Sequence, residues 1–140
     1  MKLEHVHITV NAKISPNFKA LPKDDAQRFV DRLMKTVNMK PLGPLNWSDA
    51  EDLDFPGQSF VQMITTSHCS LHLFTHENGE NEIYFDLYSC RIFDEKEVIK
   101  LLDETFGLGD WHGMLYNRAN HGKPQVTMIG KEQMLIKNRN

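Results

Sequence analysis

The stretch from residue 59 to residue 90 constrains the fold more than any other part of the chain, because apolar and polar side chains alternate in three successive segments. These segments are residues 59–65, 67–76 and 82–90. In the middle segment Cys69, Leu71 and Leu73 fall on one face, which is the two-residue period of a half-buried strand. Asn78-Gly79 supplies the left-handed residues of a tight turn before the third segment. The pattern predicts antiparallel strands with one face on a core.

Two amphipathic helices are predicted on either side of this region. The first runs from Asp24 to Val37, where apolar residues recur at three- and four-residue spacing. The second begins after Asp94, whose carboxylate can cap it, and stops at Gly107. Further strands are expected at residues 5–10 and 125–129, a long loop at 46–58 and a turn at 117–124.

The element order of strand, helix, strands, helix and strand favours an α+β fold. Two helices on one face of a mainly antiparallel sheet satisfy it, which makes a two-layer α/β sandwich. A length of 140 residues fits one domain, so we expect a single domain over residues 1–140. A two-layer sandwich leaves the second face of the sheet open. If that face is partly apolar, a second subunit would cover it.

Composition narrows the range of partners. The net charge is −3 and the basic residues are scattered, so nucleic acid is not an expected partner. No apolar run approaches the ~20 residues of a membrane span, and Met1–His5 lacks the apolar stretch of a signal peptide. We therefore expect a cytoplasmic protein whose two cysteines are reduced thiols.

The predicted strand that begins at residue 67 carries side chains that could act in catalysis. A hydroxyl nucleophile and imidazoles lie within Thr66-Ser67-His68-Cys69-Ser70-Leu71-His72, and a thiol follows in Phe85-Asp86-Leu87-Tyr88-Ser89-Cys90. These residues resemble the bacterial and archaeal S-adenosylmethionine decarboxylase family. In that family a Glu-Ser-His-x-Ser-x-His motif is followed by Asp-x-x-Thr-Cys.

The resemblance implies a cofactor made from the chain itself. Members of the family cut the chain before the serine, so Ser67 is expected to become a pyruvoyl group after cleavage between Thr66 and Ser67. The ketone of this group condenses with a substrate amine and takes up the electrons released as carbon dioxide leaves. The chain would then consist of residues 1–66 and 67–140.

Three further positions take chemical roles from the resemblance. His72 aligns with the histidine assigned to self-cleavage, and Ser59 aligns with a serine that assists it. Cys90 aligns with the cysteine that reprotonates the substrate carbon after decarboxylation, as a general acid.

The resemblance also implies a substrate site and a partner. Phe74 and Phe55 fall near aromatic residues that stack on adenine, and His76 stands where the family has a ribose-binding glutamate. The substrate would be S-adenosylmethionine, and the product would be the aminopropyl donor for spermidine. A homodimer with sites near the interface is expected. Thr66 also departs from the family, because it replaces the glutamate before the serine.

Three other functions stay open at this stage. Loss of the ribose-binding glutamate at His76 would suit a smaller substrate, such as arginine or ornithine, for the same pyruvoyl chemistry. Thr66 would suit an unprocessed relative that binds S-adenosylmethionine or a partner protein. An intact Ser67 would suit a third function, cleavage of S-adenosylmethionine without decarboxylation.

A metal site is not expected from the histidines. His68, His72 and His76 are spaced by four, but four residues of a strand span roughly 13 Å at ~3.3 Å each. Adjacent zinc ligands lie only ~2 Å from the ion, so the three imidazoles cannot share one. His5 and His7 are two apart on one strand face, a spacing that permits shared ligation, although a polar outer face is the expected interpretation.

Overall fold

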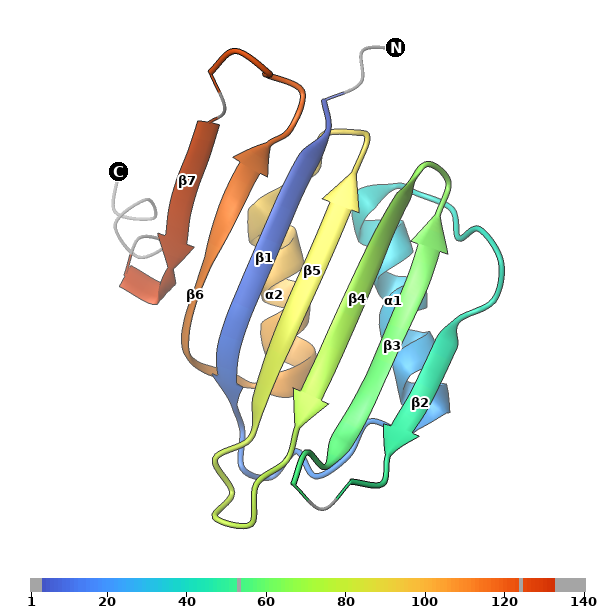
Figure 1. Ribbon diagram of the computed structural model, residues 1–140, viewed down its shortest axis with the longest axis vertical. Helices are drawn as coiled ribbons and strands as arrows, with labels where there is room; N and C mark the ends of the chain where they lie inside the picture. Colours follow the sequence, from blue (N-terminus) through green and yellow to red (C-terminus); the bar gives the residue numbers. More distant parts are fainter. Residues whose placement is uncertain (1–3, 53, 124, 133–140) are drawn as a thin grey trace.

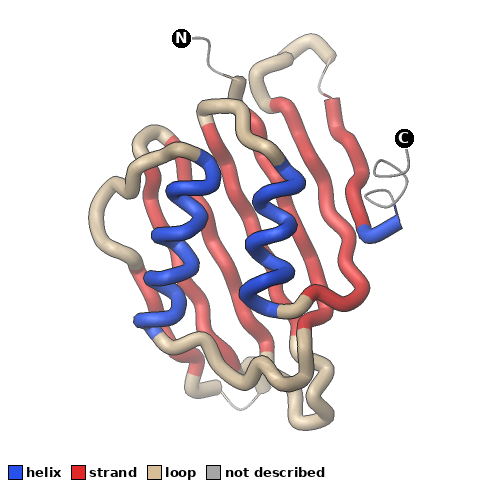
Figure 2. The backbone as a smooth tube through the Cα atoms, turned by 180° about the vertical axis from the view of Figure 1, so that it is seen from behind, coloured by secondary structure: helices blue, strands red, loops and turns tan. Residues whose placement is uncertain are grey.

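The computed structural model describes residues 4–52, 54–123 and 125–132 as two layers, one of strands and one of helices. The strands are β1 (Val6–Ile14), β2 (Asn46–Ala50), β3 (Gly57–Ile64), β4 (Ser67–Phe74), β5 (Glu82–Ser89), β6 (Leu108–Asn117) and β7 (Gln125–Gly130). They form one antiparallel sheet in the order β2-β3-β4-β5-β1-β6-β7. Both helices, α1 (Lys23–Val37) and α2 (Glu95–Phe106), cover the same face of this sheet (Figure 2). The predicted α+β sandwich is confirmed.

The core lies between the sheet and the helices. In β4, Cys69, Leu71 and Leu73 are buried while the residues between them are more exposed, as the alternation predicted. Phe29 of α1 packs against three phenylalanines, with ring centroids 6.0 Å from Phe60, 6.1 Å from Phe85 and 5.6 Å from Phe106. Burial of such side chains stabilises the fold by about 1.5–3 kcal/mol each.

The predicted ends of the second helix are also confirmed. The Asp94 carboxylate accepts a hydrogen bond from the backbone N–H of Lys96 at 2.9 Å, and this caps the start of α2. Gly107 ends the helix in the left-handed conformation, with φ of 70°.

The prediction of a long loop over residues 46–58 is wrong, because β2 occupies its first five residues and β3 begins at Gly57. β2 is an edge strand, and four of its five residues are exposed, so it has no alternating apolar pattern to detect. The exception is Trp47, whose indole N–H donates to the carbonyl of Leu21 at 2.9 Å.

The strand β6, which lies between β1 and β7, was not predicted from the sequence. Gly109 and Gly113 interrupt its pattern. Gly113 is needed there, since a Cβ at this position would lie 1.8 Å from the carbonyl oxygen of Thr9 in β1. The predicted strand at 125–129 is present as β7.

The turn before β5 differs from its prediction. Gly79 has a positive φ of 78°, but Asn78 does not. The side chain of Asn78 instead accepts a hydrogen bond from the backbone N–H of Glu80 at 3.0 Å, so Asn78 shapes the turn through its side chain.

Candidate active site

Thr65 and Thr66 form the two-residue loop that joins β3 to β4 at one end of the sheet (Figure 1). Ser67 follows directly and is only 8% exposed. Its Oγ accepts a hydrogen bond from the backbone N–H of Cys90 at 2.9 Å, and the Thr66 hydroxyl donates to Cys90 Sγ at 3.2 Å. The predicted cleavage site and the predicted general acid are therefore in contact. We refer to Thr66, Ser67 and Cys90 as the Ser67 cluster.

The thiol pKa values of the two cysteines are shifted in opposite directions. The hydrogen bond from Thr66 is the main reason why the pKa of the Cys90 thiol lies below its ordinary value, and contacts with Ser67 and Arg91 lower it further. Burial, followed by the charge of Asp86, raises the pKa of Cys69 to about 12. Cys90 is therefore suited to proton transfer, whereas Cys69 is a packing residue of the core.

A cavity of about 450 Å³ adjoins the Ser67 cluster. It is lined by residues 38–40 after α1, by Thr65 and Thr66, and by Cys90 and Arg91. This volume lies in the range of ordinary small-molecule sites. Among the lining residues the charged side chains are Lys40 and Arg91, and both are cationic.

His72 and Ser59 lie elsewhere on the sheet. They face each other across β3 and β4, and Ser59 Oγ is 2.7 Å from His72 Nδ1 on the face that the helices leave open. His72 is five positions from Ser67 along β4, which corresponds to roughly 16 Å at ~3.3 Å per residue. An odd separation also places the two side chains on opposite faces. Within one chain, the structure does not bring these two predicted processing residues to Ser67.

The predicted substrate-binding residues also lie toward the far end of β4. The Phe74 ring contacts Tyr84 edge-on, with centroids 5.6 Å apart. His76 Nε2 lies 3.8 Å from a carboxylate oxygen of Glu82. Phe55, in the segment before β3, is 64% exposed. We refer to Ser59, His72, Phe74 and His76 as the His72 cluster.

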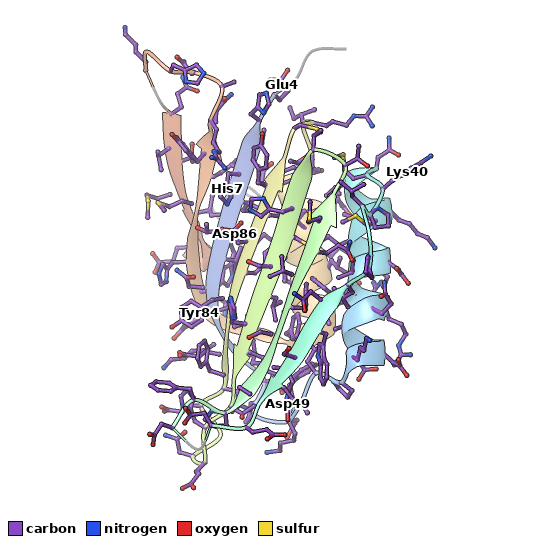
Figure 3. All side chains as sticks on the ribbon, turned by 45° about the vertical axis from the view of Figure 1, so that its right-hand side comes forward. Glu4, His7, Lys40, Asp49, Tyr84 and Asp86 are labelled. Atoms are coloured by element: carbon purple, nitrogen blue, oxygen red, sulfur yellow. The ribbon has the colours of Figure 1, made fainter. Side chains whose placement is uncertain are left out.

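A third polar group on the open face consists of His7, His68 and Asp86, and the sequence did not predict that these residues lie together. His7 Nε2 lies 2.7 Å from a carboxylate oxygen of Asp86 (Figure 3). His68 Nε2 lies 3.6 Å from the same oxygen. Tyr88 is between these histidines, and its hydroxyl contacts His5. The alternation of polar and apolar residues indicated that His7 and His68 face away from the core. Their proximity to Asp86 could not be predicted in this way, because it depends on how β1 and β4 pair with β5.

The histidines do not assemble a metal site in the part of the chain that the structure describes. No group of three or more His, Cys, Asp or Glu side chains in residues 4–52, 54–123 and 125–132 could hold an ion. His68, His72 and His76 each contact a different partner. His5 precedes β1 and is not one of its residues, contrary to the predicted strand at 5–10. In the same described ranges, neither helix is long and apolar enough to cross a membrane.

Comparisons with known proteins bear on the family and the fold of the chain. A protein family described as S-adenosylmethionine decarboxylase matches residues 6–119. No curated protein sequence matches the chain significantly. Among solved structures, the fold is similar to the crystal structure of the adenosylmethionine decarboxylase from Aquifex aeolicus VF5. The TM-score is 0.64 at 14% sequence identity, over 84% of this chain and 92% of that one.

Proposed function

The chain belongs to the S-adenosylmethionine decarboxylase family, and from that premise we propose that it cleaves itself between Thr66 and Ser67 and then decarboxylates S-adenosylmethionine. The observation that carries the proposal is the Ser67 cluster, where hydroxyls of both residues at the cleavage site contact Cys90 beside a cavity of about 450 Å³. The product would serve spermidine synthesis. Two free thiols at Cys69 and Cys90 fit a cytoplasmic location.

The residues around Ser67 fit a pyruvoyl group formed in place. The Ser67 hydroxyl is nearly buried, lies next to the carbonyl of Thr66 in the chain, and is oriented by the N–H of Cys90. Once formed, the group supplies an electron sink for decarboxylation. Cys90 contributes a proton donor at the cavity wall, in the role that the family alignment gives it. Lys40 and Arg91 line the same cavity and can pair with the carboxylate of the substrate.

The distance between Ser67 and His72 supports a homodimer as the active form. The two clusters lie toward opposite ends of β4. A two-fold axis between two face-to-face sheets, perpendicular to the strands, would place the Ser67 end of one copy over the His72 end of the other. The Thr66–Ser67 peptide at the end of β4 would then face Ser59 and His72 of a second copy, while the Ser67 hydroxyl and Cys90 meet on the side of the helices.

The open face of the sheet has the surface that such packing needs. Five apolar side chains on this face are 43% to 58% exposed. They are Val61, Met63, Met114, Val126 and Met128, and they flank the polar centre formed by β4, β5 and β1. Under the same two-fold axis, β3 of one copy meets β3 of the other, so the patches bury each other in an isologous contact.

A carboxylate lies near the position of the missing ribose-binding glutamate. Glu82 is 3.8 Å from His76 and also accepts a hydrogen bond from the Tyr84 hydroxyl at 3.2 Å. A carboxylate can accept hydrogen bonds from two ribose hydroxyls, whereas an imidazole cannot. Glu82 therefore favours S-adenosylmethionine over arginine or ornithine. We expect Glu82→Gln to raise the KM for S-adenosylmethionine about tenfold, the effect of losing a charged hydrogen-bond partner, with kcat little changed.

The direct test is release of labelled carbon dioxide from carboxyl-labelled S-adenosylmethionine, arginine and ornithine. We expect release from S-adenosylmethionine alone. Ser67→Ala is the matched control, because it removes the cofactor precursor with a minimal change in volume, and it should abolish release. Absence of carbon dioxide from all three substrates with the unaltered protein would contradict the proposed function.

A further inference from the structure

The residue before the proposed cleavage site has an unfavourable backbone conformation. Thr66 has a φ of 57°, in the left-handed region. A β-branched residue is a genuine outlier there, because its Cβ substituents clash with the backbone. Thr65 does not share the positive φ, so the loop has the sign pattern of a type II turn, which ordinarily places glycine at the second central position. Two-residue hairpins favour other turn types.

Residues with unfavourable backbone conformations lie around Cys90 and Arg91. In the part of the chain that the structure describes, three non-glycine residues have positive φ: His5, Asn38 and Thr66. The backbone N–H of His5 donates to the carbonyl of Cys90 at 3.5 Å, and the carbonyl of Asn38 accepts from Arg91 at 3.3 Å. Thr66 donates to Cys90 Sγ. Strained residues cluster in this way at functional sites.

The three residues differ in how ordinary their conformation is. Asn38 ends α1, and asparagine is a common left-handed residue at a helix C-terminus. Thr66 has no such explanation, and it adjoins the scissile peptide. The contacts on both sides of that peptide, from Thr66 Oγ to Cys90 Sγ and from the Cys90 N–H to Ser67 Oγ, hold the loop in this form.

We propose that Thr66 is a positioning residue that holds the Thr66–Ser67 peptide in a strained turn, and that release of this strain promotes self-cleavage. The inference rests on the proposed function. It explains why a β-branched residue stands where the turn itself would favour glycine.

The chemical steps balance without an external oxidant or reductant. Ser67 Oγ adds to the carbonyl carbon of Thr66, the amide C–N bond breaks, and the hydroxyl proton ends on the amine, which leaves an ester. A base removes the Cα proton of residue 67, and the Thr66 carboxylate leaves. The resulting dehydroalanine tautomerises to an imine, and water hydrolyses the C=N bond to give the ketone of the pyruvoyl group and release the nitrogen of residue 67 as ammonia. Once the chain is open, the two-residue loop no longer fixes Thr66 in the left-handed region.

The experiment follows cleavage of newly made protein by intact-mass spectrometry during cell-free synthesis. Thr66→Gly relieves the strain, and we expect it to slow cleavage by at least about tenfold. Thr66→Val is the matched comparison, because it keeps the β-branch and removes the hydroxyl. We expect Thr66→Val to slow cleavage by no more than about fivefold, the effect of one neutral hydrogen bond.

A stability measurement separates strain from a merely structural role. In a Ser67→Ala background, which cannot cleave, Thr66→Gly should raise the denaturant midpoint, whereas Thr66→Val should not. A structural role predicts the reverse, a glycine variant that is both slower and less stable. The same measurement shows whether each variant folds.

Three outcomes would overturn the inference. Equal cleavage by Thr66→Gly and the unaltered protein would remove strain as a cause. Equally slow cleavage by Thr66→Gly and Thr66→Val would assign the effect to the hydroxyl. An unaltered chain that never cleaves would overturn the proposed function itself, and this inference with it, whereas the first two outcomes leave the proposed function intact.

Discussion

His72 and Ser67 lie five positions apart in β4, yet Ser67 is buried toward the helices while His72 is exposed on the open face of the sheet. His72 therefore cannot reach Ser67 of the same chain in this conformation. The proposed homodimer supplies His72 from a second copy, and this gives it a test that does not depend on measuring its size.

The first prediction is that two inactive variants restore each other. Ser67→Ala and His72→Ala should each fail to cleave alone. When they are produced together, the mixed dimer has one site with an intact Ser67 and an intact His72 from different copies. Random assembly places about half of the His72→Ala chains in mixed dimers, so up to about half of them should be cut. Intact-mass spectrometry measures this fraction.

A double variant is the control for the first prediction. Ser67→Ala/His72→Ala produced together with His72→Ala should give no cleavage, because no site then contains both residues. Cleavage of His72→Ala by itself at the normal rate would show that His72 is not needed. No cleavage in the mixture of single variants would contradict the shared site.

The second prediction concerns thiol reactivity. The pKa of Cys90 is lowered from 9.0, so its thiolate should persist at lower pH than that of an ordinary cysteine, and alkylation should slow only as the pH falls through the lowered value. Cys69, with a pKa of about 12 and no exposed surface, should stay unmodified in the folded protein. Iodoacetamide labelling at several pH values, followed by peptide mapping, measures both.

Thr66→Val is the matched variant for this measurement. It removes the hydrogen bond that lowers the pKa of Cys90 most, so the reactivity profile of Cys90 should move to higher pH. An unchanged profile would contradict the assigned cause. Preferential labelling of Cys69 would contradict the assignment of the two thiols.

The third prediction tests the pairing of β1 with β6. Gly113→Ala would place a Cβ 1.8 Å from the carbonyl oxygen of Thr9, so the backbone must shift, and we expect a loss of about 1–3 kcal/mol in the free energy of unfolding. Gly122→Ala is the control, since nothing lies within 4 Å of a Cβ there. Denaturant unfolding measures both variants, and equal stability of the two would contradict the close approach.

Strands in which apolar and polar side chains alternate could be predicted from the sequence. Strands without that alternation could not be predicted. β4 and β5 show one apolar face each, which follows directly from burial on the helices. β2 is an exposed edge strand, so no apolar period marks it. In β6, the glycine at 113 reads as a break, although it is required by close backbone packing against Thr9.

The candidate site shows a similar division. The hairpin that carries Ser67 and Cys90 could be predicted from the sequence, but their contact could not, because the turn between β4 and β5 sets which residues end side by side. The separation of Ser67 from His72 could have been predicted, since two residues five positions apart in a strand point to opposite faces. The pairing of His7 with Asp86 was not, because it depends on β1 lying next to β5, a neighbour far away in the sequence.

Self-cleavage at Ser67 can be measured by intact-mass spectrometry of the purified protein under denaturing conditions. We expect two fragments, one ending at Thr66 and one beginning with a pyruvoyl group in place of Ser67, and Ser67→Ala should give one uncut chain. A single full-length mass for the unaltered protein after long incubation would show that the chain does not cleave itself and would rule out the proposed mechanism.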